Sequence, residues 1–176
     1  MKKRLLITPS IIFFLILSTF FYLLSIERNP SEVPSSLINK RVPNFKTESL
    51  LKNKMFVSSE QFGDEIMLVN FFATWCKPCL EEHNYIKLFS SEKGIRIVGI
   101  NYKDNPKKTT QWLKELGNPY SDIPLDKNGR IAIEWGVYGI PETFLISSQG
   151  IIKYRHVGPI TKKTYKKINK LINELK

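Results

Sequence analysis

Four stretches of the chain carry the apolar pattern of strands. Residues 66–74 (IMLVNFFAT) and 95–102 (IRIVGINY) are nearly continuous apolar runs, as expected of strands that are buried on both faces. Residues 143–146 and 151–156 predict two more strands, and the turn residues 147–150 between them indicate a hairpin. The chain therefore has the pattern of a sheet with a buried centre.

Apolar side chains recur at helical spacing between and after these strands. We expect helices over residues 77–90, from Asn105-Pro106 onward, over 130–135 and over 162–175. The order strand, helix, strand, helix, hairpin, helix predicts an α/β domain with a mixed sheet and helices on both of its faces. Residues 42–45 and 55–57 are candidates for short edge strands.

The N-terminal segment has a different pattern. Residues 5–26 carry no charge, and 22 residues at about 1.5 Å each reach roughly 33 Å, enough for a hydrocarbon core of about 30 Å. A cleavable signal peptide is the rival interpretation, but the run is long and no alanine precedes Ala73, so the usual cleavage site is absent. The sequence favours one uncleaved transmembrane helix that holds the chain in a lipid bilayer.

Charges beside this segment predict its orientation. Three basic residues, 2–4, precede it, and the positive-inside tendency keeps them in the cytoplasm and places the rest of the chain in the periplasm or its equivalent. Residues 27–40 contain two prolines and three serines, which is typical of a linker. We therefore expect an anchor over 1–26, a linker over 27–40 and a working domain over 41–176, on the outer face of the cytoplasmic membrane.

Composition and charge narrow the function classes. A chain of 176 residues with two cysteines, 42% hydrophobic residues and nineteen glycines and prolines is neither a multidomain enzyme, a disulfide-stapled miniprotein nor a disordered chain. The net charge of +11 is concentrated at the ends: the first 28 residues carry +3 and the last 24 carry +7, which leaves about +1 between them. This distribution indicates a solvated helix face, with weak attraction to anionic lipid as the alternative, and no nucleic-acid partner.

Both cysteines of the chain, Cys76 and Cys79, stand directly after a predicted strand and at the start of a predicted helix. Unpaired N–H groups and the positive end of the helix dipole face the first sulfur there, which favours the thiolate. Cys76 is therefore the predicted nucleophile. Cys79, one turn later and turned toward the domain, is predicted to resolve a mixed disulfide. A C-x-x-C next to such a strand-helix pattern is typical of a thioredoxin-like redox motif.

Several stretches around this motif resemble one family. They are residues 73–79 (ATWCKPC), 82–83 (EH), 98–104 (VGINYKD), 112–120 (WLKELGNPY) and 136–144 (GVYGIPETF). Together they resemble the membrane-anchored cytochrome c biogenesis thioredoxins, the CcmG or DsbE family of the thioredoxin superfamily. The similarity extends from about Val42 to the C-terminus, and the 136–144 stretch is more specific to the family than C-x-x-C alone.

This resemblance implies a thioredoxin-like fold of three layers around a central mixed sheet, and a periplasmic thiol-disulfide oxidoreductase that needs no cofactor and no metal ion. In the family, electrons come from a membrane thiol carrier of the DsbD or CcdA type. They pass to the C-x-x-C-H cysteines of apocytochrome c, directly or through a haem-ligation thiol partner. The resemblance therefore implies a reductant that serves cytochrome c maturation.

The resemblance also implies a substrate-binding edge. Pro141 corresponds to the family's cis-proline, which faces the active site. With Pro141 in that place, the backbone of Ile140 can pair with an extended substrate peptide as an added strand. Trp75 is expected to pack against the motif and cover one side of the sulfurs, or to contact docking partners.

Two acidic residues match the family's carboxyls around the dithiol, so Glu82 and Glu142 join the two cysteines as candidate catalytic residues. A nearby carboxylate raises the pKa of a thiol and can exchange a proton with Cys79. Thioredoxins usually place a buried aspartate on the preceding strand, whereas this chain has Asn70, which cannot act as a base. Either glutamate is therefore the better candidate. His83 is expected to be a packed, hydrogen-bonded histidine.

Other interpretations of the cysteines remain open at this point. A permanent disulfide would close a very small loop and constrain little of the unfolded chain, and a zinc site would have only His83 and His156 as further soft ligands. A general extracytoplasmic reductase or oxidase of the same fold is the second functional hypothesis. A copper chaperone that uses His156 is a remote third, because such sites usually have a C-x-x-x-C spacing.

Overall fold

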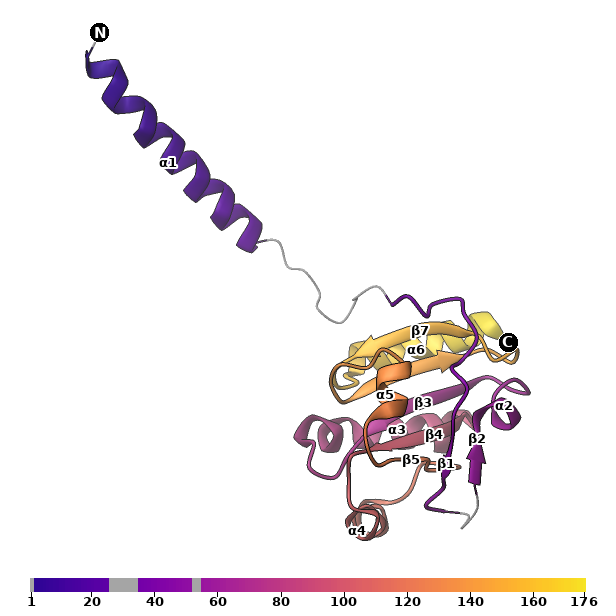
Figure 1. The fold of residues 1–176 in the computed structure, drawn as a ribbon. Coiled ribbons are helices and arrows are strands. Elements are labelled where there is room, and N and C mark those ends of the chain that lie inside the picture. Colours follow the sequence, from indigo (N-terminus) through magenta and orange to yellow (C-terminus); the bar gives the residue numbers. More distant parts are fainter. Residues whose placement is uncertain (1, 26–34, 52–54) are drawn as a thin grey trace. The chain divides into compact units, whose positions relative to one another are not determined.

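The computed structural model describes residues 2–25, 35–51 and 55–176 (Figure 1). The chain divides into two units, Met1–Pro30 and Ser31–Lys176. The linker predicted over residues 27–40 lies outside the described residues as far as residue 34.

The described part of the first unit is one helix, α1 (Lys2–Ser25), with Pro9 inside it. Its side chains from residue 9 to 25 are exposed, and many of them are large and apolar. Within the parts of the chain that the structure describes, no helix combines the length and apolar character needed to span a bilayer. The membrane anchor over residues 1–26 therefore stays a prediction.

A five-stranded sheet forms the centre of the second unit, in the order β5-β4-β3-β6-β7 (Figure 1). Strand β3 (Met67–Phe72) pairs in parallel with β4 (Arg96–Tyr102), which pairs in parallel with the short β5 (Leu125–Asp126). On its other side β3 pairs antiparallel with β6 (Glu142–Ile146), and β6 with β7 (Ile152–Val157). The predicted mixed sheet is confirmed.

Three helices cover one face of this sheet: α3 (Lys77–Lys93), α4 (Pro106–Leu116) and α6 (Lys162–Leu175). The alternation of side chains along β3 sends Leu68 and Phe72 to this face, where both cysteines belong to the same buried cluster. The strongly amphipathic α6 packs Ile168 and Ile172 inward, while its lysines stay in solvent.

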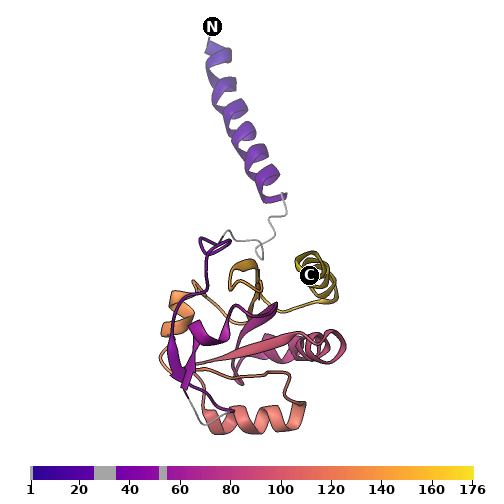
Figure 2. The ribbon, with the colours of Figure 1, turned by 90° about the vertical axis from the view of Figure 1, so that its right-hand side faces the viewer.

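The opposite face is covered by α5 (Arg130–Glu134) and by a hairpin of β1 (Lys46–Glu48) and β2 (Met55–Val57). A one-turn helix, α2 (Ser58–Gln61), follows the hairpin. Trp135 fills the centre of this side and contacts three phenylalanine rings. Figure 2 shows helices on both sides of the sheet, so the expected three layers are present.

Most predicted elements are found within a few residues of their expected ends, but one edge strand is wrong. Residues 42–45 are not a strand; the strand that pairs with β2 begins at Lys46. Helix α3 continues past the predicted residue 90 to Lys93, where Gly94 takes the left-handed conformation that ends it. Strand β5 and helix α2 were not predicted.

The topology brings one end of three strands together. Because β3 and β4 are parallel, the loops after Phe72 and after Tyr102 leave the sheet at the same edge. Strand β6 runs antiparallel to β3, so it begins at that edge, directly after Pro141. The C-x-x-C motif, the 103–105 loop and the 140–141 peptide therefore meet in space.

Candidate active site

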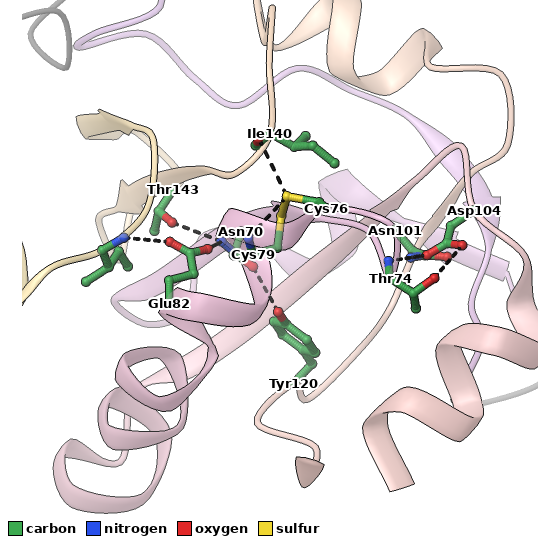
Figure 3. The surroundings of a disulfide bond; sticks show 11 residues. Asn70, Thr74, Cys76, Cys79, Glu82, Asn101, Asp104, Tyr120, Ile140 and Thr143 are labelled. Carbon is green, nitrogen blue, oxygen red and sulfur yellow. Dashed lines mark hydrogen bonds between the residues drawn. A yellow bond between two sulfur atoms is a disulfide. The ribbon is translucent and has the colours of Figure 1, made fainter. Parts of the chain in front are cut away.

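Asp104 holds the turn between β3 and the first cysteine. Its carboxylate accepts hydrogen bonds from the Thr74 backbone N–H at 2.6 Å and from the Thr74 hydroxyl at 2.9 Å. It also accepts from the side-chain amide of Asn101 at 3.3 Å and from the backbone N–H of Asn105 at 2.7 Å. Asp104, in the loop after β4, thus fixes the conformation of the loop after β3 (Figure 3).

The two cysteines form a disulfide with an S–S distance of 2.09 Å (Figure 3). Cys76 is the N-cap of α3, and its sulfur accepts the backbone N–H of Cys79 at 3.2 Å. The same N–H and the helix dipole would stabilise a thiolate at Cys76 after reduction. In the disulfide form Cys76 is 5% exposed and Cys79 2%, so the first sulfur has only slightly more access to solvent.

The Ile140–Pro141 peptide bond is cis, as the family resemblance implies. The carbonyl oxygen of Ile140 lies 3.6 Å from the Cys76 sulfur. In the disulfide this sulfur has no proton to donate, but a reduced Cys76 thiol could donate to that oxygen. The Ile140 backbone and the Cys76 sulfur are thus neighbours in space, and Pro141 follows Ile140 in the chain.

Glu82 lies one turn after Cys79 on α3 and is 1% exposed. One carboxyl oxygen accepts the side-chain N–H of Asn70 at 2.8 Å, and the other accepts the backbone N–H of Ile160 at 2.8 Å. Burial raises the pKa of Glu82 from 4.5 to about 8, although both hydrogen bonds favour the charged form. This carboxyl therefore titrates near neutral pH, as suits a group that takes up and releases a proton.

Asn70 links Glu82 to two more side chains. Its amide N–H groups donate to Glu82 and, at 3.0 Å, to the hydroxyl of Thr143, while its oxygen accepts the hydroxyl of Tyr120 at 2.9 Å. All four side chains are buried. Burial, and then the charge of Glu82, raise the pKa of Tyr120. Figure 3 shows this polar network beneath the disulfide.

Glu142 is placed differently from Glu82. The alternation along β6 directs it to the opposite face of the sheet, where Arg155 of β7 donates to it at 2.7 Å. The guanidinium also donates to the Gly136 carbonyl at 2.9 Å, and the Tyr138 N–H donates to Glu142 at 3.2 Å. The structure thus ties Glu142 to the 136–139 loop, whereas Glu82 lies on the helix of the dithiol.

Trp75, which precedes Cys76, and Tyr138, two residues before Ile140, are exposed side chains, at 59% and 63%. The indole N–H of Trp75 donates to the Lys103 carbonyl at 3.2 Å, and its ring is tilted against Tyr102. The ring of Tyr138 lies over the Arg155 guanidinium. Trp75 is therefore held by the 102–103 segment while much of its surface faces solvent, as a docking contact would require.

Both histidines are packed in the domain. His83 is hydrogen-bonded to the Gly117 carbonyl at 2.9 Å and lies edge-on against Trp112, as expected. His156 is hydrogen-bonded to the Pro159 carbonyl at 3.2 Å. Burial lowers the pKa of both rings. Among the residues that the structure describes, no three His, Cys, Asp or Glu side chains gather as a metal site would.

Sequence reasoning missed four residues of this site. Tyr120, Thr143, Asp104 and Arg155 come from four different segments, and only the fold brings them to the cysteines and glutamates. A signal existed for Asp104, because a polar side chain just after a buried parallel strand is often part of a site. Arg155 had no such signal, because it is one buried cation in a C-terminal segment of net charge +7 whose lysines are exposed.

Comparison with known proteins agrees with this geometry. Residues 37–172 match the Redoxin family. The chain is 40% identical to the thiol:disulfide interchange protein DsbE of Vibrio cholerae and 41% identical to that of Escherichia coli K12; each match covers 94% of this chain and 91% of the relative.

Solved structures share the fold at lower identity. A DsbE-like protein from Chlorobium tepidum superimposes with a TM-score of 0.68 at 21% identity, covering 79% of this chain and 98% of that one. A secreted thiol-disulfide isomerase from Corynebacterium glutamicum gives a TM-score of 0.69 at 18% identity, covering 86% of this chain and 94% of that one. From the extent of the sequence matches, this chain belongs to the DsbE (CcmG) thiol:disulfide interchange proteins of the Redoxin family, and it is a dithiol-disulfide oxidoreductase.

Proposed function

We propose that this oxidoreductase is a reductant of apocytochrome c on the periplasmic face of the cytoplasmic membrane. Its substrates are the C-x-x-C-H cysteines of apocytochrome c or a haem-ligation thiol partner, and a membrane thiol carrier of the DsbD or CcdA type returns it to the dithiol form. The observation that carries the proposal is the 40–41% identity to DsbE proteins along nearly the whole chain.

The first chemical step uses Cys76. Its thiolate attacks one sulfur of the substrate disulfide; a Cys76–substrate disulfide forms, and the second substrate sulfur leaves as a thiolate that takes up a proton. The helix N-terminus supports this assignment, because the Cys79 N–H already points at the Cys76 sulfur. The backbone of Ile140 binds the substrate segment as an added strand beside Pro141, and Trp75 contacts it from the exposed side.

The second step uses Cys79. Its thiol gives its proton to Glu82, and its sulfur attacks Cys76, which forms the disulfide seen here. The substrate sulfur that was joined to Cys76 leaves as a thiolate and takes up the proton that Glu82 releases. In total the substrate gains two electrons and two protons, and the protein dithiol loses them. We assign the proton to Glu82 because the Glu142 carboxylate is paired with Arg155; Glu142 instead holds the loop that leads to Pro141.

We also propose the organisation predicted from the sequence: an anchor over residues 1–26, a linker over 27–40 and a periplasmic domain over 41–176. Two observations support it. Residues 5–26 carry no charge, and the apolar side chains of α1 from Ile11 to Leu24 are largely exposed, as a lipid environment would allow.

A trapping experiment tests the function. In cells that make c-type cytochromes, the Cys79→Ser variant cannot resolve its mixed disulfide, so Cys76 should remain bound to its substrate. We expect apocytochrome c or a haem-ligation protein among the partners released by reductant and identified by mass spectrometry. The Cys76→Ser variant is the matched control and should retain none of these partners.

Other outcomes point elsewhere. Capture of unrelated envelope proteins alone would contradict the cytochrome role and favour a general extracytoplasmic oxidoreductase. Faster alkylation of Cys79 than of Cys76 in the reduced wild-type protein would contradict the assignment of the nucleophile.

A further inference from the structure

The buried amide of Asn70 could face its neighbours in two ways. In the observed orientation its two N–H groups donate to Glu82 and Thr143, and its oxygen accepts from Tyr120. Rotation by half a turn would place the amide oxygen against the Glu82 carboxyl and the N–H groups against Tyr120. A carboxylate cannot donate to that oxygen, whereas a protonated carboxyl can. The rotated amide would therefore favour the protonated form of Glu82.

Tyr120 bears on these orientations through its hydroxyl proton: the observed amide offers an oxygen that accepts this proton, whereas the rotated amide would present only N–H donors to it. Its ring stacks on Phe72 with 4.6 Å between the ring centroids. On the sheet, Gly99 lies beside Asn70 in the β3–β4 register, and a Cβ on Gly99 would come within 2.7 Å of the Tyr120 ring. The absence of a side chain at Gly99 thus makes room for this ring over the sheet, and packing directs the hydroxyl to the Asn70 oxygen.

We propose that Tyr120 is a positioning residue: its hydroxyl holds the Asn70 amide with an N–H toward Glu82 and so keeps this carboxyl able to accept the proton of Cys79. The inference rests on the role proposed above for Glu82. It adds to the site a side chain from the segment after α4. The hydrogen bonds of the network connect Tyr120 to Asn70, and Asn70 to Glu82.

The other groups around Glu82 are mostly neutral. The carboxyl faces Asn70 from β3, the Ile160 N–H from the segment before α6, and Cys79 from its own helix. His156 lies opposite Thr143 in the β6–β7 register, and burial lowers its pKa, which favours the neutral ring. The titratable groups to account for are therefore Cys79, Tyr120 and His156.

The test compares wild type with Tyr120→Phe, which keeps the ring and removes the hydroxyl. In the oxidised full-length protein in detergent, the ¹³C chemical shift of the Glu82 carboxyl reports its titration midpoint. We expect the variant to bind this proton about three- to tenfold more tightly, an upward shift of about half to one pH unit, since a buried charged group loses a fixed donor. An unchanged or lower midpoint would overturn the inference.

A kinetic measurement gives a second readout. Glutathione disulfide is mixed with the reduced full-length protein, and the decay of the mixed disulfide at Cys76 is followed by acid quenching. At pH 7 the Tyr120→Phe variant should resolve it about three- to tenfold more slowly, because less Glu82 is ionised. Placing 4-aminophenylalanine at position 120 restores a donor and should restore the rate. Failure of this rescue would contradict a positioning role.

Two further variants separate the possible failures. Tyr165→Phe removes a hydroxyl that donates to Glu92 at the surface, and it should change neither readout. In a Glu82→Gln background, Tyr120→Phe should no longer slow the resolving step. If Glu82→Gln by itself leaves the pH profile of resolution unchanged, the proton acceptor of the proposed function is wrong. If it alters the profile and Tyr120→Phe does not, only the inference about Tyr120 is wrong.

Discussion

Glu82 shows how far a single side chain can depart from its behaviour in water. Two N–H donors favour its charged form, yet burial outweighs them and raises its pKa to about 8. Among the described side chains, those that Asn70 links to it, Thr143 and Tyr120, carry neutral hydroxyl groups. The Glu82 carboxyl can therefore be either protonated or ionised in the pH range in which thiols react, whereas an exposed glutamate would be ionised there.

The raised pKa has a consequence for stability. Below pH 4.5 Glu82 is protonated in both the folded and the unfolded chain; above it, ionisation favours the unfolded chain until the folded carboxyl also ionises at about pH 8. We expect Glu82 to lower the free energy of unfolding by a few kcal/mol across this window. Urea unfolding of the oxidised protein should show that Glu82→Gln loses less stability than wild type from pH 4.5 to 8. Glu81→Gln, an exposed neighbour, should match wild type.

The Arg155 and Glu142 pair makes a different residue-scale prediction. Both side chains are buried, so Arg155→Met leaves a carboxylate without its cation. We expect a loss of about 3–5 kcal/mol in the free energy of unfolding at pH 7. Adding Glu142→Gln should recover most of it, since no unpaired charge remains. Chemical denaturation measures both; a single variant as stable as wild type would show that the pair contributes no stability.

At the scale of elements, the conformation of the loops around the cysteines depends on contacts between the segments that follow neighbouring parallel strands. Asp104 follows β4 and holds Thr74, which follows β3. Asp104→Ala should destabilise the domain by about 1–3 kcal/mol, because the partly buried donors of Thr74 and Asn101 lose a charged acceptor. It should also slow disulfide exchange at Cys76, measured with glutathione disulfide. Asp64→Ala, at an exposed position, is the control and should change neither value.

Elements with a strong pattern of their own could be predicted from the sequence. Strands β3 and β4 are long apolar runs, and α6 has a clear amphipathic repeat, so each is found close to its predicted bounds. Strand β5 has two residues and α2 one turn, too short for any periodicity to show. Strand β1 is defined by its pairing with β2, which places it at Lys46 and not at residue 42.

The same distinction holds for the candidate site. Local spacing predicts Cys76 at a helix start and Cys79 one turn later, because both lie on or next to one helix. Glu82, on the same helix, is a candidate only through the family resemblance. Local spacing cannot predict that Tyr120 reaches Asn70 from 50 positions away, or that Arg155 neutralises Glu142 from the neighbouring strand. Those contacts depend on register and crossover connections, which no local pattern encodes.

For the whole molecule, the two units make different contributions. Both buried clusters of the described chain, with the apolar residues packed on them, are made of residues after 36, so the second unit has a complete core without residues 1–30. The described part of the first unit is one helix with exposed apolar side chains, and the hydrogen bonds described around the disulfide join residues of the second unit. Residues 31–176 should therefore be sufficient for folding and thiol chemistry, and residues 1–30 should determine where in the cell the protein is held.

Removing residues 1–30 tests this division. We expect the chain that begins at Ser31 to be soluble, to unfold in one cooperative transition and to react with glutathione disulfide at the full-length rate, since its core and site are intact.

The full-length chain should stay with membranes through alkaline carbonate extraction. In cells, the truncated Cys79→Ser variant, exported by a cleavable signal peptide in place of residues 1–30, should trap less of the membrane-bound partners, because it is no longer confined near them. Recovery of the full-length chain in the soluble fraction would contradict the anchor, while loss of folding or rate in the truncated chain would contradict an independent domain.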